Sequence, residues 1–261
     1  MKCYKYGRGD IPLVLFHGWG MNSSVWKPII ELLSSQFTLH LFDLPGYGIN
    51  FEENATSLDD ITKLLAHKIP NNSIIAGWSL GGLVALRLAM KAENNIKGLA
   101  IIASSPCFTE KNDWAGISPT ILQEFKNQLS RDKKKTIKKF LALQTIGTTS
   151  SRKDTVFLQN TVIESLPDIS VLDSGLDLLI NTDLRNCLHN LKSPVIRIYG
   201  EIDTLIPTIN SQHLDILYKQ GYTTVMPSAG HVPFISHPEE FSHLLIDFSK
   251  KITQPFIKGK V

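Results

Sequence analysis

Residues 77–82 of this 261-residue chain read Gly-Trp-Ser-Leu-Gly-Gly, between an apolar run at 73–76 and a helical pattern at 83–90. This is the pattern Gly-x-Ser-x-Gly in the setting of a strand, a turn and a helix. Glycines at positions 77 and 81 permit a turn that is too tight for side chains. The turn is expected to strain Ser79 and to expose its hydroxyl at the carboxyl edge of a sheet. A plainer interpretation is that Ser79 only caps the helix.

Short apolar segments alternate with helical patterns on both sides of this turn. The strands are expected at 12–16, 38–42, 73–78, 96–103, 195–199 and 223–226. The helices between and after them are expected at 25–35, 58–69, 80–92, 211–220 and 238–251. Fully apolar strands that alternate with helices predict an α/β fold, with a mostly parallel central sheet and helices on both faces.

Residues 107–185 interrupt this alternation. Only helical patterns occur in this stretch, at 119–130, 133–145, 152–165 and 169–180. We expect a single domain, with a core formed by 1–106 and 186–261 and a helical lid, 107–185, inserted after the sixth strand. No linker-like stretch or internal repeat argues for a second domain. Residues 253–261 are expected to form a frayed tail.

The composition excludes several classes of protein. Apolar residues make up 43% of the chain and charged residues 20%, which is typical of a globular domain, and the net charge of +3 is too small to indicate nucleic-acid binding. Cys3, Cys107 and Cys187 fit neither a disulfide framework nor a metal site. No segment has the length and apolarity of a signal peptide or a membrane span. We therefore expect a cytoplasmic protein with no metal and no membrane partner.

A serine hydroxyl becomes a nucleophile when a base takes its proton and an acid orients that base. Candidates for both follow later strands, with Asp203 in Gly-Glu-Ile-Asp at 200–203 and His231 in Ser-Ala-Gly-His at 228–231. The small residues before His231 would let its imidazole reach back toward Ser79. The order nucleophile, acid, base is typical of one large class of hydrolases.

Three other residues compete for these roles. Glu201 lies in the same turn as Asp203 but closer to the strand, and is expected to point to solvent. Asp43 precedes the nucleophile in the chain and is expected to anchor the turn at 45–46. His237 precedes Pro238 at an expected helix start, where a structural role is the better interpretation.

Acyl transfer also needs donors for the oxyanion that develops on the substrate. One is the backbone N–H that follows the nucleophile, at Leu80. The other is expected from the loop His-Gly-Trp-Gly at 17–20, where Trp19 is the favoured donor and Gly18 the alternative. An ordinary turn between a strand and a helix is the plainer interpretation of this loop.

Together these motifs identify the chain as a member of the α/β-hydrolase superfamily, with a resemblance that covers nearly the whole chain. Within it, the chain resembles the family of biotin-pathway pimeloyl-[acyl-carrier protein] methyl ester carboxylesterases. The matching stretches lie at 17–22, 77–85, 103–108, 140–145 and 233–238. The most specific are Ala-Ser-Ser-Pro-Cys-Phe at 103–108 and Phe-Leu-Ala-Leu-Gln-Thr at 140–145.

The resemblance implies a serine carboxylesterase that removes the methyl ester from a pimeloyl chain on acyl carrier protein, without a cofactor. It implies Ser79, Asp203 and His231 as the catalytic triad and Trp19 and Leu80 as the oxyanion donors. The residues expected to bind the substrate are Trp19, Ser79, Leu80, Phe108, Phe140, Leu141, Ala142, Leu143, Gln144 and His231.

Positive charge gathers on the expected lid between residues 131 and 153. Lys135, Lys138 and Lys139 are expected to share a helical face with Arg131, opposite an apolar side. Such a helix suits an acidic carrier protein that delivers an acyl chain, and a solvated lysine-rich helix is the alternative.

The residues expected to dock the carrier are Lys135, Lys139 and Arg152. Nucleic acid is a weaker candidate, because no aromatic residues are interleaved with these charges for stacking. We expect a monomer.

Other functions fit the same motifs. A general short-chain carboxylesterase, a thioesterase or a carbon–carbon bond hydrolase would use the same triad. A non-catalytic ligand receptor on this fold could also retain it. A dehalogenase or epoxide hydrolase is disfavoured, because those enzymes carry aspartate at the position of Ser79.

Overall fold

A computed structural model describes residues 1–91, 96–219 and 221–253. In this part of the chain one sheet has the strand order β1-β3-β2-β4-β5-β6-β7. Its strands are β1 Cys3–Tyr6, β2 Ile11–Phe16, β3 Phe37–Phe42, β4 Ile74–Trp78, β5 Gly98–Ile102, β6 Val195–Gly200 and β7 Gly221–Met226. β1 is antiparallel to β3, and every other pair is parallel. The mostly parallel sheet predicted from the apolar strands is confirmed.

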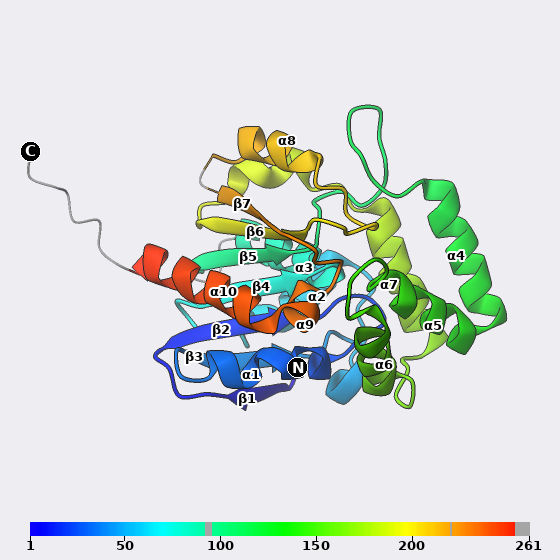
Figure 1. Ribbon diagram of the computed structural model, residues 1–261, viewed down its shortest axis with the longest axis horizontal. Coiled ribbons are helices and arrows are strands. Elements are labelled where there is room, and N and C mark those ends of the chain that lie inside the picture. The colour runs from blue at the N-terminus through cyan, green and yellow to red at the C-terminus, as the bar shows by residue number, and fades with distance from the viewer. Residues whose placement is uncertain (92–95, 220, 254–261) are drawn as a thin grey trace, which may run out of the picture.

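Helices cover both faces of this sheet (Figure 1). α1 Lys27–Leu33 and α10 Pro238–Thr253 pack together on one face, and α2 Leu58–Ala66 and α3 Leu80–Lys91 pack together on the other. α8 Asn210–Leu217 and the single-turn α9 Pro233–Ser236 complete the core. The central strands β4, β5 and β6 are buried along their whole length, which explains why their sequences are apolar except for Arg197 in β6.

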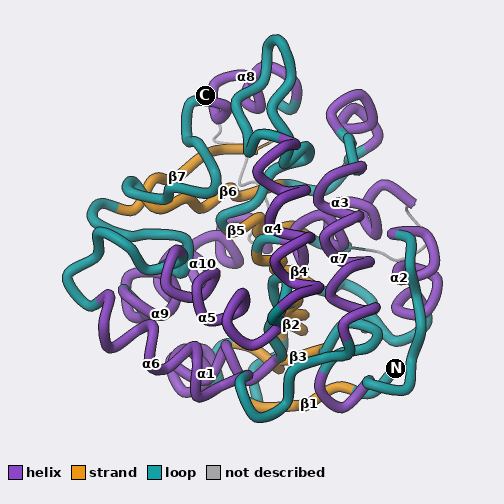
Figure 2. Tube along the Cα trace, turned by 90° about the vertical axis from the view of Figure 1, so that its right-hand side faces the viewer, coloured by secondary structure: helices purple, strands orange, loops and turns teal. Residues whose placement is uncertain are grey.

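The insertion consists largely of helices that lie between β5 and β6. They are α4 Pro119–Arg131, α5 Lys133–Leu143, α6 Ser151–Val162 and α7 Ile169–Asn181. They gather at one end of the sheet in Figure 1, and Figure 2 shows α4, α5 and α7 in front of the strands from that end. The insertion follows five described strands, not six: the four expected before it, and the short strand β1.

Several sequence predictions differ from the structure in detail. β1 was not expected, since its four residues are largely exposed and polar, as edge strands often are. Residues 92 and 220, at the ends of two expected helices, and residues 254–261 of the expected tail lie outside the described residues. No helix in the described ranges has the length and apolarity to span a membrane.

Arg131 does not share a helical face with Lys135, contrary to expectation. α4 ends at Arg131, and the backbone of Asp132 is not helical, with φ of −151° and ψ of 87°. The Asp132 side chain accepts the backbone N–H of Lys135 at 3.0 Å and so caps the start of α5. The break between the two helices separates Arg131 from the lysines of α5.

A substitution at Gly81 tests how tightly α3 packs on the sheet. A Cβ at this position would lie 2.4 Å from the backbone oxygen of Phe16, which cannot move aside easily. We expect Gly81→Ala to lower the free energy of unfolding by more than about 2 kcal/mol in denaturant titrations. Gly98→Ala is the matched control, because its Cβ would meet the ends of the Ile252 and Phe248 side chains and cost less. Equal losses in the two variants would contradict this packing.

Candidate active site

Ser79 stands alone between two elements, since β4 ends at Trp78 and α3 begins at Leu80. Its φ is +52°, in the left-handed region that residues with a Cβ rarely adopt. Its N–H donates to the carbonyl of Ile102 at 3.0 Å, and its carbonyl accepts the N–H of Gly82 at 2.9 Å. The structure therefore holds Ser79 in the strained turn that the Gly-x-Ser-x-Gly pattern predicts.

The imidazole of His231 lies beside the carboxylate of Asp203. Nδ1 of His231 is 2.9 Å from Oδ2 of Asp203, and the two side chains are 2% and 0% exposed. The other carboxylate oxygen, Oδ1, accepts the backbone N–H groups of Leu205 at 2.8 Å and Ile206 at 3.1 Å. Because the carboxylate accepts, Nδ1 carries the proton, and a lone pair is left on Nε2.

His231 shares a cavity with Ser79. Nε2 of His231 is buried and forms no hydrogen bond within the described ranges. The backbone of His231 is held on two sides, because its N–H donates to the carbonyl of Gln144 at 3.1 Å and its carbonyl accepts Nε1 of Trp78 at 2.8 Å. A fixed imidazole with a free Nε2 can serve as a base for a hydroxyl that approaches it in this cavity.

The loop 17–20 follows β2 and passes directly beside Ser79. A Cβ added to Gly18 would lie 3.1 Å from Cβ of Ser79. Trp19 lines the cavity, and its indole Nε1 donates to a carbonyl of α7 at 2.8 Å. Among the residues that the structure describes, the backbone N–H groups of Trp19 and Leu80 donate to no acceptor. Two unpaired N–H groups close to a nucleophile are what an oxyanion requires.

His17 fixes the shape of this loop. The N–H of Leu44 donates to its Nε2 at 2.9 Å, so Nδ1 carries the proton and donates to the carbonyl of Gly18 at 2.8 Å. Burial lowers the pKa of His17 more than the nearby Asp43 carboxylate and the bond to Gly18 raise it. The loop is therefore built around a neutral imidazole.

The residues weighed against Asp203 and His231 have other partners. Asp43 accepts two backbone N–H groups of neighbouring loops, and Glu201 accepts one from the turn at residue 228. His237 bonds to the hydroxyl of the preceding serine at the end of α9. None of the three lines the cavity in the described structure.

The cavity is apolar apart from Ser79 and His231. Of the other residues predicted to bind the substrate, those that line it are Trp19, Phe108, Phe140 and Leu143. Seven further residues line the cavity that were not predicted from the sequence: Ile117, Ile121, Leu122, Phe125, Leu176, Leu179 and Leu205. The apolar spacing of Ile121, Leu122 and Phe125 on one expected helix was a usable signal. The leucines of α7 carried no such signal, because a leucine that lines a cavity cannot be told from a core leucine in the sequence.

Four predicted substrate-binding residues do not line the cavity: Leu80, Leu141, Ala142 and Gln144. For the helical residues the reason is the 100° turn per residue. Phe140 and Leu143 face the cavity, while Leu141 is fully buried in the core and Ala142 is exposed. Gln144 is buried and reaches the site through its backbone carbonyl. Leu80 can contribute its backbone N–H.

The cavity opens between α4 and α5. Ile121 of α4 is 61% exposed and Leu143 of α5 is 44% exposed, although both line the cavity. A shallow depression on the outer side of α5 is lined by Asp132, Lys134, Lys135, Lys138, Lys139 and Ala142. Arg152 is exposed on the first turn of α6, outside this depression. Two of the three predicted docking residues, Lys135 and Lys139, thus line this depression.

Comparison with known families and curated proteins gives clear matches. A family model described as the alpha/beta hydrolase fold matches residues 11–238. A pimeloyl-[acyl-carrier protein] methyl ester esterase of Yersinia pseudotuberculosis is 44% identical over 249 residues, which are 95% of this chain and 96% of that protein. The esterase of the same name from Yersinia enterocolitica is 44% identical over 246 residues, 94% and 95% of the two chains.

Solved structures share the fold at low sequence identity. An esterase from Exiguobacterium antarcticum superposes with a TM-score of 0.85 at 18% identity, over 95% of this chain and 94% of that one. A hydrolase from Oleispira antarctica gives a TM-score of 0.85 at 22% identity, over 97% and 94%. These likenesses support the fold and carry no information on substrate.

The neutral state of His17 predicts a pH dependence of stability. Because its pKa is lowered in the folded protein, the unfolded chain binds this proton more readily, so the free energy of unfolding should fall as pH drops below about 6.5. The contribution is at most about 1.4 kcal/mol per pH unit. Denaturant titrations at several pH values should show a shallower dependence in His17→Gln. An unchanged slope in His17→Gln would contradict the assignment.

Proposed function

The chain belongs to the alpha/beta hydrolase fold family and to the family of pimeloyl-[acyl-carrier protein] methyl ester esterases within it, and we propose that it hydrolyses the methyl ester of a pimeloyl chain carried on acyl carrier protein. The observation that carries the proposal is the buried hydrogen bond between Asp203 and His231, together with the apolar cavity that His231 and Ser79 both line. That arrangement is suited to acyl transfer on an aliphatic ester.

In the first half of the proposed reaction, Oγ of Ser79 attacks the ester carbonyl carbon while Nε2 of His231 takes the hydroxyl proton. Asp203 keeps the imidazole in the required tautomer and stabilises the imidazolium that forms. The backbone N–H groups of Trp19 and Leu80 bind the negative oxygen of the tetrahedral intermediate. The carbon–oxygen bond to the methoxy group then breaks, and His231 returns the proton to the departing methanol.

The second half releases the acid. Water gives its proton to Nε2 of His231 and attacks the acyl carbonyl of Ser79, forming a second tetrahedral intermediate. The bond to Oγ of Ser79 breaks, the serine takes back a proton from His231, and the free carboxylic acid leaves. Every proton is accounted for by the triad and water, and no cofactor takes part in these steps.

The acyl chain is proposed to lie in the apolar cavity beneath residues 107–185, which act as a lid on a single-domain core. The walls contributed by α4, α5 and α7 match a run of methylene groups. With the methyl ester at Ser79, the carrier end of the chain would leave the cavity between Ile121 and Leu143. This route supports a docking site on the outer side of α5.

The carrier is proposed to dock on the lysines of α5, close to the mouth of the cavity. Lys135 and Lys139 supply the positive charge in the depression there together with Lys134 and Lys138, and Arg152 adds charge on α6. An acidic partner would be steered by this charge, which raises the association rate more than it tightens the final complex. The lysines are exposed, so salt should weaken the effect.

The triad assignment predicts a sharp difference between two neighbouring carboxylates. Asp203→Asn should lower kcat about 10⁴-fold, because the amide can hold the imidazole in the wrong tautomer. Glu201→Gln, in the same turn, should stay within a few-fold of wild type, and Ser79→Ala should be inactive. The measurement is methanol release from a methyl pimeloyl ester. Comparable losses in the two carboxylate variants would rule out the assignment of Asp203.

Docking on α5 predicts an effect confined to the carrier-linked substrate. Lys135→Glu with Lys139→Glu should lower kcat/KM for the methyl pimeloyl-carrier roughly tenfold at low ionic strength, with the difference shrinking as salt is added. The same variant should hydrolyse free dimethyl pimelate normally. Lys250→Glu with Lys251→Glu makes the same charge change at the end of α10 away from the insertion (Figure 1), and should match wild type on both substrates. An unchanged carrier rate would refute docking on α5.

A further inference from the structure

The hydroxyl of Ser104 donates a hydrogen bond to the backbone of Ser79, the residue that carries the nucleophile. Ser104 lies just past the end of β5 and is fully buried. Its Oγ donates to the carbonyl of Ser79 at 2.7 Å, and the same carbonyl accepts the N–H of Gly82. The N–H of Ser79 donates to Ile102, also at the end of β5. The end of β5 therefore holds both backbone polar groups of Ser79.

The carbonyl of Ser79 and the N–H of Leu80 belong to one peptide unit. The peptide bonds in the described ranges are trans, and a trans peptide is planar with its C=O and N–H pointing in opposite directions. A bond that fixes the Ser79 carbonyl thus also fixes the direction of the Leu80 N–H. It also polarises the peptide and makes that N–H a stronger donor.

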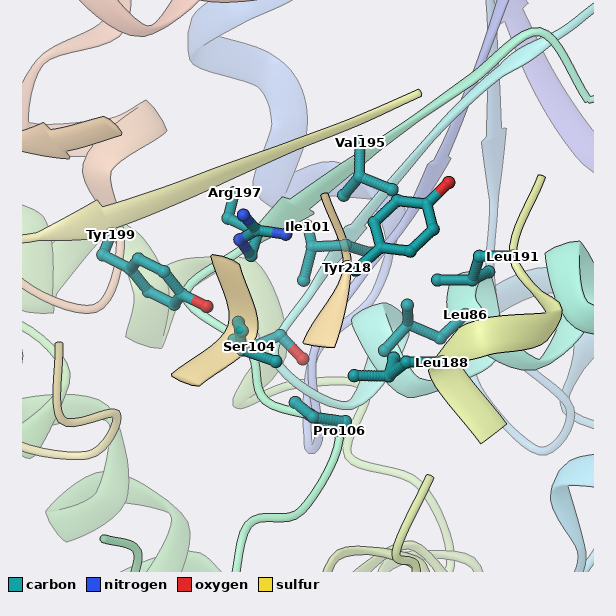
Figure 3. Close-up of a pocket in the computed structure, with 11 residues that line it drawn as sticks. Leu86, Ile101, Ser104, Pro106, Leu188, Leu191, Val195, Arg197, Tyr199 and Tyr218 are labelled. Carbon is teal, nitrogen blue, oxygen red and sulfur yellow. The ribbon is translucent and has the colours of Figure 1, made fainter. Parts of the chain in front are cut away.

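The surroundings of Ser104 offer its hydroxyl few acceptors other than the carbonyl of Ser79. Figure 3 shows Ser104 at the wall of a small pocket whose other lining side chains include Leu86, Ile101 and Pro106. This lining is mostly aliphatic and offers few competing acceptors. On the other side, a Cβ at position 82 would lie 2.3 Å from Oγ of Ser104, so glycine there leaves room for the hydroxyl.

The backbone before Ser104 is strained in the same way as that of Ser79. Ala103 has a φ of +40°, and its N–H is held by the carbonyl of Ile198 at 2.8 Å. A non-glycine residue in this region costs on the order of 1–3 kcal/mol, and persists only where its surroundings fix it. The strain turns the chain at the end of β5 and brings the next hydroxyl onto the nucleophile peptide.

We propose that Ser104 is a positioning residue for the oxyanion site: its hydroxyl aligns the Ser79–Leu80 peptide so that the Leu80 N–H meets the oxyanion. This inference rests on the proposed esterase function. Ser104 itself touches no reacting atom. It acts on the transition state, where the oxyanion exists, and leaves the binding of the neutral ester unaffected.

The test is Ser104→Ala, assayed on dimethyl pimelate. We expect kcat to fall about tenfold, less than the 10²–10³-fold loss when an oxyanion donor itself is removed. KM should stay within about twofold of wild type, as expected for an interaction made only in the transition state. The inhibition constant of a trifluoromethyl ketone analogue, whose serine adduct carries an oxyanion, should rise by the same factor as kcat falls. That constant does not depend on the fraction of protein that is folded.

Ser73→Ala is the matched control. Ser73 is also fully buried, and its hydroxyl bonds to the carbonyl of Pro70 next to the opposite end of β4. It should lose stability in thermal unfolding while keeping kcat and the inhibition constant of wild type. The inference is overturned if Ser104→Ala matches wild type, or if kcat falls with no change in inhibitor affinity. Activity that survives in Ser79→Ala would instead defeat the proposed function itself.

Discussion

The left-handed backbone of Ser79 is the constraint around which the site is arranged. A Cβ in this region costs on the order of 1–3 kcal/mol, so the turn exists only because the surrounding backbone fixes it. Ile102 and Gly82 hold the two polar groups of its backbone, and Ser104 adds a third bond. Side chains are absent at positions 77 and 81, where a Cβ would lie 2.2 Å and 2.4 Å from backbone oxygens. The turn is therefore bound closely to β2 and β5.

The insertion contacts both His231 and the loop at 17–20, two parts of the candidate site. The carbonyl of Gln144, at the end of α5, holds the backbone of His231. The indole of Trp19 bonds to α7 and packs edge-on against Phe125 and Phe140 of α4 and α5. A movement of these helices would reach the imidazole and the loop at 17–20 together. This coupling links the position of the acyl chain to the position of the catalytic groups.

The fold was largely readable from sequence because most of its inner strands are buried on both faces and are therefore largely apolar. The edge strand β1 escaped because exposed strands carry no such signal. In the site, Asp203 was preferred to Glu201 because Glu201 lies closer to the strand, and His231 was preferred to His237 for its small neighbours; the structure pairs Asp203 with His231. What the sequence could not give was the side of each helix that meets the cavity. Leu141 and Ala142 were misassigned for that reason, and the α7 leucines were missed.

The claim that Ser79 is activated by the pair His231 and Asp203 is tested most directly by covalent labelling. The protein is treated with an alkyl fluorophosphonate, and the modified peptide is identified by mass spectrometry. The account predicts one adduct, on Ser79, formed rapidly in wild type and far more slowly in His231→Ala. Labelling at another serine, or equal rates in wild type and His231→Ala, would contradict it.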